Sequence, residues 1–349
     1  MKSRRRSLVL AGSATLLGAA TFAGATEEPR MPAEALEKLL ADASSSAPAL
    51  RAVVVMRNGV LAGERYYAGA SANDLLAVNS ATKSVCSMLV GQALQQGKIR
   101  GLGQTVAELL PEAVRNAPDS PASRVTLQQI LTGTTGLAYD WRTQIEPLFS
   151  SADPVAYVLA LQGDGSAPGT WSYNDAAVSL LTPILERAHN GMPLADVAKR
   201  DLFAPLGIER FTWRNDKSGH ATAYMGLSLR TRDLAKLAWT MADGGRWNDA
   251  QVVPADWAAD STRRHVAALW RNPPVTDIGY GHLWFTGTLD GREVAWGWGY
   301  GGQFSLFVPS LRLVVATAAT SPAPRDVAAQ TATVAALVRQ IAALAAASA

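Results

Sequence analysis

The chain has 349 residues, of which 48% are hydrophobic and 17% charged. This is the composition of a globular protein with a large core, and it excludes a disordered or fibrous chain. Four of the 32 basic residues lie in the first 25 positions, which leaves 28 basic against 29 acidic residues in the remainder. A remainder so close to neutral gives no reason to expect nucleic acid or an anionic membrane as a partner.

The first 25 residues have the layout of a secretory signal peptide. Basic residues at positions 2 and 4–6 precede an apolar stretch at 8–22, and Ala23-Gly24-Ala25 fits a cleavage site. The adjacent arginines followed by apolar residues are typical of twin-arginine signals. We therefore expect export to the periplasm or secretion, with no stable membrane anchor after cleavage. A retained anchor is the alternative.

The elements that follow begin with a helical stretch at 33–43. Two β-rich runs at 51–56 and 61–67 flank Asn58-Gly59, a strong hairpin signal. Residues 80–96 then predict one helix that ends at Gly97. Because this helix is apolar on nearly all sides, we expect it to lie inside the protein.

The middle of the chain is mainly helical, and the C-terminal part is rich in short strands. Helical patterns occupy 125–131, 154–161, 176–188, 194–202 and 234–242, whereas β-rich runs occupy 282–286, 292–296, 303–308 and 311–317, before a closing helix at 327–347. Such close spacing of strands allows hairpins and predicts an antiparallel sheet. We expect an α/β fold of the α+β type, in which both chain ends share that sheet.

One hydrolase domain is predicted over residues 26–349. Its sheet part covers 26–100 and 220–349, and its inserted helical part covers 101–219. The cleft between the two parts is the expected site.

Ser80 and Lys83 form a Ser-x-x-Lys pattern at the start of the buried helix. Three residues of helix place both side chains on one face, about one turn apart. A serine before a helix is also a common N-cap, so the pattern alone is weak. The position of Lys83 strengthens it, because an ammonium among apolar residues requires a partner or a function. We predict that Ser80 is a nucleophile assisted by Lys83.

Tyr173 lies in a Pro/Gly-rich loop that leads into a helix. Moving a tyrosine pKa from about 10 to about 7 takes roughly 4 kcal/mol. An ammonium at about 4 Å supplies about that much at an effective dielectric constant of about 20. The hypothesis is therefore that Lys83 makes Tyr173 a phenolate base, and the alternative is a tyrosine that only packs under the loop.

A glycine-rich segment at 297–302 matches G-x-G-x-x-G by letter, but a β-rich run follows it, which excludes a dinucleotide fingerprint. Glycines at such a place suit close approach of a ligand to the backbone. We predict that Trp298, Gly299, Tyr300 and Gly301 bind substrate, with the backbone N–H of Tyr300 as an oxyanion donor.

The remaining reactive residue types give weaker signals. His189, His220, His265 and His282 show no metal-ligand spacing, so neither a metal nor a cofactor is predicted. Cys86, the single cysteine, lies mid-helix among apolar residues and is predicted to be a core residue. A Ser-His-Asp triad that uses His265 or His282 remains an alternative.

Together these motifs resemble the serine β-lactamase and penicillin-binding superfamily over residues 50–320. The resemblance is to its class C side, with D-alanyl-D-alanine peptidases, family VIII esterases and 6-aminohexanoate-dimer hydrolases. Ser80 and Lys83 match the nucleophile motif, and Tyr173 begins the Y-x-N motif. Further similar stretches are residues 131–137, 244–247, 253–257 and 299–303.

The resemblance implies acylation of Ser80, proton transfer by Lys83 and Tyr173, and an oxyanion hole from the N–H groups of Ser80 and Tyr300. Two departures stand out: Asp175 replaces the Asn of Y-x-N, and Gly297 replaces a cation that holds substrate carboxylates. From its position in that motif, Asp175 is also expected to bind substrate. We therefore expect a small, carboxylate-poor ester or amide as substrate. A β-lactamase or peptidase, or a catalytically silent penicillin-binding-like protein, are the alternatives.

Overall fold

The computed structural model describes residues 31–348, so the predicted signal peptide lies outside the described residues. Its centre is an antiparallel sheet of eight strands in the order β2-β1-β13-β12-β11-β10-β9-β8. These strands are β1 (Leu50–Arg57), β2 (Val60–Tyr66), β8 (Val266–Ala267), β9 (Thr276–Tyr280), β10 (Phe285–Leu289), β11 (Arg292–Gly299), β12 (Gln303–Val308) and β13 (Leu313–Ala319).

Small sheets accompany the large one. They are built from β3 (Leu76–Ala77), β4 (Phe211–Trp213) and β5 (Leu227–Leu229), and from β6 (Arg246–Trp247) and β7 (Ala250–Gln251).

The longer helices are α1 (Ala33–Ser46), α2 (Thr82–Gln95), α6 (Trp141–Phe149), α9 (Leu181–Ala188), α11 (Thr231–Ala242), α12 (Ala255–Ser261) and α13 (Val327–Ala346). The shorter ones are α3 (Val106–Leu109), α4 (Pro111–Val114), α5 (Leu127–Thr132), α7 (Pro154–Leu159), α8 (Asp175–Ser179) and α10 (Leu194–Ala198).

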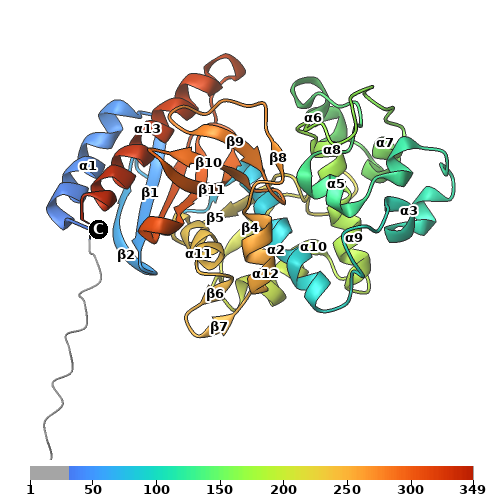
Figure 1. Ribbon diagram of the computed structural model, residues 1–349, viewed down its shortest axis with the longest axis horizontal. Coiled ribbons are helices and arrows are strands. Elements are labelled where there is room, and N and C mark those ends of the chain that lie inside the picture. Colours follow the sequence, from blue (N-terminus) through green and yellow to red (C-terminus); the bar gives the residue numbers. More distant parts are fainter. Residues whose placement is uncertain (1–30, 349) are drawn as a thin grey trace, which may run out of the picture.

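Helices cover the large sheet. α13 packs on β13 and α1 packs on β2, whereas α11 packs on β1, β12 and β13, and α2 on β11 (Figure 1). The segment Pro324–Ala346 is long and apolar enough to span a membrane by length and composition alone. In the described chain, however, it contributes buried residues such as Val334 and Ile341 to the core.

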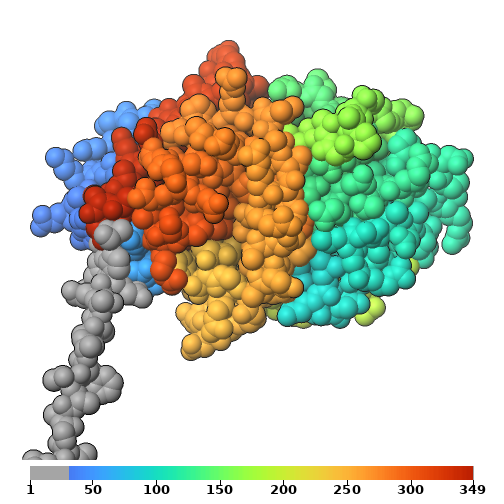
Figure 2. All heavy atoms as spheres, viewed as in Figure 1, coloured from blue at the N-terminus to red at the C-terminus, as the bar shows by residue number. Residues whose placement is uncertain are grey.

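Helices α3 to α10 form the other side of the molecule. Figure 1 shows them to the right of the sheet, and Figure 2 shows the blue and red chain ends packed together on the left. α2 contacts α9, α12 and β11, so it lies between the helices and the sheet. The first turn of α2 is therefore where the two sides of the molecule meet.

The predicted fold class is confirmed. β1 pairs with β13 and with β2, so both ends of the chain share one antiparallel sheet, and α13 is the expected closing helix. The strand expected at 282–286 was wrong by three residues, because Gly281 to Trp284 form a turn before β10. The patterning did not predict β8 and β9.

Candidate active site

Ser80 lies in η1 (Asn79–Ala81), a 3₁₀ turn between β3 and α2, and not in the first turn of the helix as predicted. The preceding residue, Asn79, has a left-handed backbone with φ of 49°. Its side-chain amide donates to the carbonyl oxygen of Tyr300 at 2.9 Å. This bond fixes the serine turn to the glycine-rich segment.

Lys83 brings three groups together at the floor of the site. Its Nζ donates to Ser80 Oγ at 3.0 Å and to the carbonyl oxygen of Tyr224 at 2.9 Å, and it pairs with Asp175 Oδ1 at 2.6 Å. Both charged side chains are almost fully buried, with exposed fractions of 3% and 1%. An ammonium has three N–H donors, and these contacts use all of them.

Asp175 reaches this position because α8 begins there. Asn174 caps the helix through its side chain, which accepts from the N–H of Ala177 at 2.8 Å. The next residue, Asp175, then points towards α2. Its carboxylate compensates the charge of the buried ammonium, which would otherwise be costly. The residue predicted to bind substrate is therefore first of all the counter-ion of Lys83, although it also lines the cavity described below.

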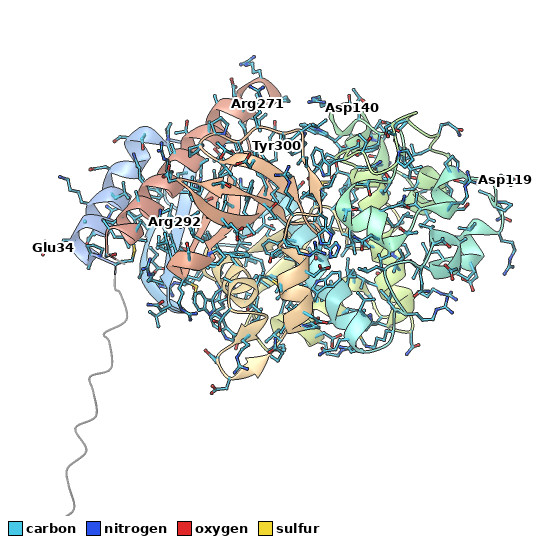
Figure 3. All side chains as sticks on the ribbon, in the orientation of Figure 1. Glu34, Asp119, Asp140, Arg271, Arg292 and Tyr300 are labelled. Atoms are coloured by element: carbon cyan, nitrogen blue, oxygen red, sulfur yellow. The ribbon has the colours of Figure 1, made fainter. Side chains whose placement is uncertain are left out.

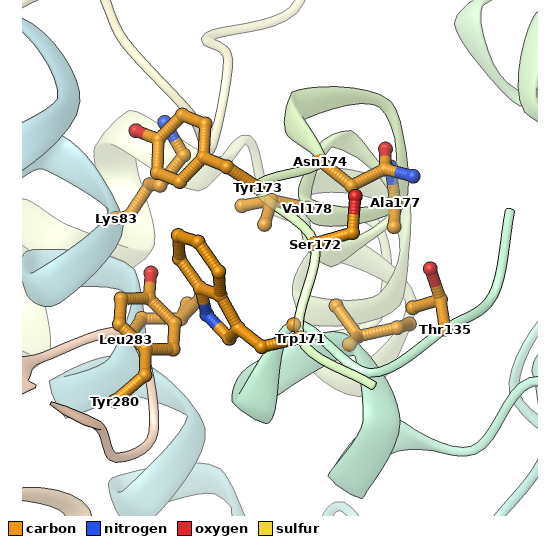
Figure 4. A pocket seen from close by; sticks show the side chains of 12 residues that line it. Lys83, Thr135, Trp171, Ser172, Tyr173, Asn174, Ala177, Val178, Tyr280 and Leu283 are labelled. Atoms are coloured by element: carbon orange, nitrogen blue, oxygen red, sulfur yellow. The ribbon is translucent and has the colours of Figure 1, made fainter. Parts of the chain in front are cut away.

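Tyr173 meets both Ser80 and Lys83. Its ring centroid lies 4.7 Å from Lys83 Nζ, and in Figure 4 its hydroxyl end points towards that amine. Burial raises the pKa of Tyr173 well above its usual value of 10.0, the Asp175 carboxylate raises it further, and a hydrogen bond with Ser80 lowers it. The direction of this pKa does not support the phenolate hypothesis, because burial, and after it the Asp175 carboxylate, favours the neutral phenol.

Packed aromatic rings hold Tyr173 in place. Trp171 and Tyr280 lie behind it, with Trp171 6.3 Å from the Tyr173 ring and 5.7 Å from the Tyr280 ring (Figure 4). The space enclosed there is only about 10 Å³. The phenol ring therefore has little room to move away from Ser80.

The backbone N–H groups of Ser80 and Tyr300 are the candidate oxyanion donors. Within the described chain, neither Ser80 nor Tyr300 donates its N–H to a backbone acceptor. Both residues line the same cavity. Free donors beside a nucleophile suit an oxyanion hole, in which each donor contributes about 10²–10³ in rate.

The glycine-rich segment at 297–302 contains glycines for a different reason than the predicted approach of a ligand. A Cβ on Gly299 would lie 2.2 Å from the carbonyl oxygen of Val78, and one on Gly297 would lie 2.9 Å from Ser84 Oγ. These glycines let β11 approach the serine turn and α2, and neither lines the cavity. β12 after them is central and buried, not exposed. The prediction that Gly299 contacts substrate is not supported, whereas Trp298, Tyr300 and Gly301 do line the cavity.

A cavity of about 870 Å³ opens over Ser80 and Tyr173. Its volume falls in the range of small-molecule sites. Sequence reasoning missed several of its walls: Trp141, Arg142, Leu269, Trp270 and Arg271. They come from α6 and from the segment between β8 and β9, and no local motif marks them. The one available signal is that Trp270 and Arg271, a large aromatic and a cation, are adjacent in the sequence, which is weak evidence for a binding site.

His265 and His282 come together with Asp260, although their spacing gave no sign of this. Among the described residues, these three form the group of His, Cys, Asp and Glu side chains whose ligand atoms could meet at a metal ion. His282 is stacked between Trp257 and His265, at centroid distances of 4.9 and 4.2 Å. None of the three lines the cavity with Ser80. A Ser80-His-Asp triad is therefore not supported.

The burial of His282 leads us to expect that the protein is less stable in acid. Burial, together with the nearby charge of His265, lowers its pKa from 6.5 to about 4. Between these values the unfolded chain binds a proton that the folded chain does not, so the free energy of unfolding should fall by about 3 kcal/mol on acidification. Urea unfolding at neutral pH and at about pH 4 measures this. Equal losses in wild type and His282→Gln would contradict it.

Comparison with known proteins identifies the family and the fold. A family model described as Beta-lactamase matches residues 42–340. The 6-aminohexanoate-dimer hydrolase of Paenarthrobacter ureafaciens is 28% identical over 225 residues, which cover 59% of this chain and 55% of that protein. The match thus spans about half the length of this curated relative.

Solved structures share the fold. A class C beta-lactamase from Rhodobacter sphaeroides superimposes with a TM-score of 0.63 at 19% identity, covering 88% of this chain and 99% of the other. An octameric penicillin-binding protein homologue from Pyrococcus abyssi gives a TM-score of 0.66 at 17% identity, covering 85% and 76%. Together with a family model that matches most of the sequence, these similarities show that the chain belongs to the beta-lactamase family.

Proposed function

We propose that the protein is a serine hydrolase that cleaves an ester or amide through an acyl-enzyme on Ser80. The observation that carries this proposal is the contact of the Ser80 hydroxyl with a buried, charge-compensated ammonium at the floor of a large cavity. A buried ion pair is costly to maintain and weak evidence for stability. Its position beside a hydroxyl supports a catalytic role.

The first half of the reaction transfers the acyl group to the serine. Ser80 Oγ bonds to the carbonyl carbon, and the bond from that carbon to the leaving oxygen or nitrogen breaks. The hydroxyl of Tyr173 accepts the proton of Ser80 and passes its own proton to the leaving group, so Tyr173 ends as a phenol. Lys83 donates to Ser80 Oγ throughout and stabilises negative charge on it.

The second half reverses these roles. A water molecule enters from the cavity, and its oxygen attacks the acyl carbon while its proton passes through Tyr173 to Ser80 Oγ. The ester bond to Ser80 breaks, and a carboxylic acid leaves. We assign the N–H groups of Ser80 and Tyr300, two residues that line the cavity, to the oxyanion in both halves.

Asp175 also bears on the alternatives of a β-lactam or cell-wall substrate. An asparagine at this position can both donate and accept a hydrogen bond, whereas a carboxylate only accepts. Asp175 is already paired with Lys83, and Gly297 offers no cation for a substrate carboxylate. These departures favour a simple ester or amide over a β-lactam.

Labelling with a fluorophosphonate, followed by intact-mass measurement, tests the proposal. We expect one adduct on the wild type and none on Ser80→Ala. Ser84→Ala is the matched control, because this buried serine of α2 bonds to the carbonyl oxygen of Leu283 and not to Lys83. A wild type that takes no label and hydrolyses no ester would indicate a catalytically silent protein.

The protein is further proposed to act outside the cytoplasm, in the periplasm or after secretion. The support is the signal-peptide layout of residues 1–25 and a remainder with almost balanced charge.

A further inference from the structure

The cavity over Ser80 has mainly apolar walls. Trp141 and Ile145 come from α6, Leu269 and Trp270 from the segment between β8 and β9, and Trp298 from β11. Leu269 is 79% exposed, unusually high for a leucine beside a cavity. The other four side chains are half-buried, so together with Leu269 they leave an apolar surface at the opening that a ligand can cover.

The aromatic walls contact one another and lead down to the reactive groups. The ring of Trp270 lies 4.4 Å from the ring of Tyr173 and 5.5 Å from that of Trp298. Trp141, from α6, meets Tyr300 edge-on at 6.3 Å. An apolar chain bonded to Ser80 would therefore run between indole rings, which bury large areas on contact.

The charged residues that line the cavity are arranged asymmetrically. Asp175 lies at the floor and is paired with Lys83, whereas Arg142 and Arg271 are exposed, as residues of a rim are. Arg142 is engaged with neighbours, since it lies 5.1 Å from the centroid of Trp141 and 3.4 Å from Asp140. Arg271 makes no ion pair or hydrogen bond within the described chain. Figure 3 shows Arg271 and Tyr300 on the part of the sheet side that faces Asp140, the N-cap residue of α6.

We propose that the substrate is an amphipathic ester or amide, with an apolar acyl chain between the tryptophans and an anionic group at its far end that Arg271 binds. This inference rests on the proposed function, because it names the substrate of the same Ser80 site. A guanidinium matches a carboxylate with two parallel hydrogen bonds. Arg271 comes from a loop distant in sequence and does not occupy the position of Gly297, so the argument against a β-lactam stands, whereas the expectation of a carboxylate-poor substrate is revised.

Two matched esters test the anionic end. The p-nitrophenyl ester of octanoic acid and the mono-p-nitrophenyl ester of octanedioic acid have the same chain length and differ by one terminal carboxylate. For the wild type we expect a higher kcat/KM for the dioic ester, through a lower KM. In Arg271→Gln, the ratio of the two kcat/KM values should fall by about 3- to 10-fold, as for an exposed charge pair with paired hydrogen bonds.

Arg292→Gln is the matched control. This arginine is the first residue of β11, where its guanidinium donates to the carbonyl oxygen of Asp290, and it does not line the cavity. It should leave the ratio as in the wild type. A ratio unchanged by Arg271→Gln, or lowered equally by Arg292→Gln, would overturn the role of Arg271.

Binding to the inactive Ser80→Ala protein separates this inference from the proposed function. Calorimetry with methyl octanoate and with monomethyl octanedioate should give a lower Kd for the anionic ester, and Arg271→Gln should remove that difference. This result can hold even if no ester is hydrolysed, in which case the proposed function fails alone. Equal Kd values for the two esters would reject the amphipathic substrate while hydrolysis stands.

Discussion

Replacing Lys83 with methionine is expected to lower kcat/KM for any accepted ester by about 10²–10⁴-fold, the range for a group that assists proton transfer. Lys83 is the one cation in hydrogen-bond contact with Ser80 Oγ in the described chain. Without it, the serine oxygen would have to develop negative charge beside an uncompensated carboxylate. Initial rates with a chromogenic ester measure the loss.

The same substitution should also destabilise the fold, because Asp175 would remain buried and unpaired. Breaking one partner of a buried ion pair costs about 3–5 kcal/mol, whereas removing both is often neutral. The double variant Lys83→Met with Asp175→Asn should therefore regain stability without regaining activity. Were the double variant active, Lys83 would have only a structural role.

Asp175→Asn restores the Y-x-N pattern. After Lys83→Met, we expect it to change stability and activity the most. It leaves the Lys83 ammonium buried without its counter-ion, so the free energy of unfolding should fall by about 3–5 kcal/mol. Chemical denaturation measures this cost. A loss below that range would mean that the ammonium finds another acceptor beyond Ser80 and Tyr224.

The same variant should change the pH profile. The carboxylate of Asp175 is the second cause, after burial, that raises the pKa of Tyr173. Removing it lowers that pKa, so the loss of activity that follows ionisation of the phenol should begin at lower pH than in the wild type. If Tyr173 were instead a phenolate base, activity would rise with pH in that range.

Asp233→Asn is the matched control for this prediction. Asp233 is also fully buried and pairs with Arg230 at 2.6 Å and Lys236 at 3.1 Å, but it lies on α11 and does not line the cavity. Its replacement should destabilise the protein and leave the pH profile unchanged. A shift in both variants would mean that the profile reports unfolding and not Tyr173.

Local patterns were enough to predict much of the fold. Asn58-Gly59 between two β-rich runs gave the hairpin of β1 and β2, and both Asn58 and Gly59 have the positive φ that such a turn requires. The apolar run after Lys83 gave the buried helix α2. These signals work because each depends on residues that are neighbours in sequence.

The electrostatics of the site could not be predicted in this way. The argument about Tyr173 included Lys83 but not the charge of Asp175, which lies two positions further along and turns back to the ammonium. Which of several nearby charges dominates depends on distances that a sequence does not contain. The cavity walls were missed for a similar reason, since Trp141 and Trp270 meet the site only through tertiary packing.

The pairing of β1 with β13 affects how the protein can fold. Leu50 faces Ala319 and Arg57 faces Leu313. These two neighbouring strands therefore pair residues that lie more than 250 positions apart in the sequence. During synthesis, β1 has no partner on that side until nearly the whole chain has left the ribosome. A ribosome stalled before β13 would release a chain with open strand edges, which are sites of aggregation.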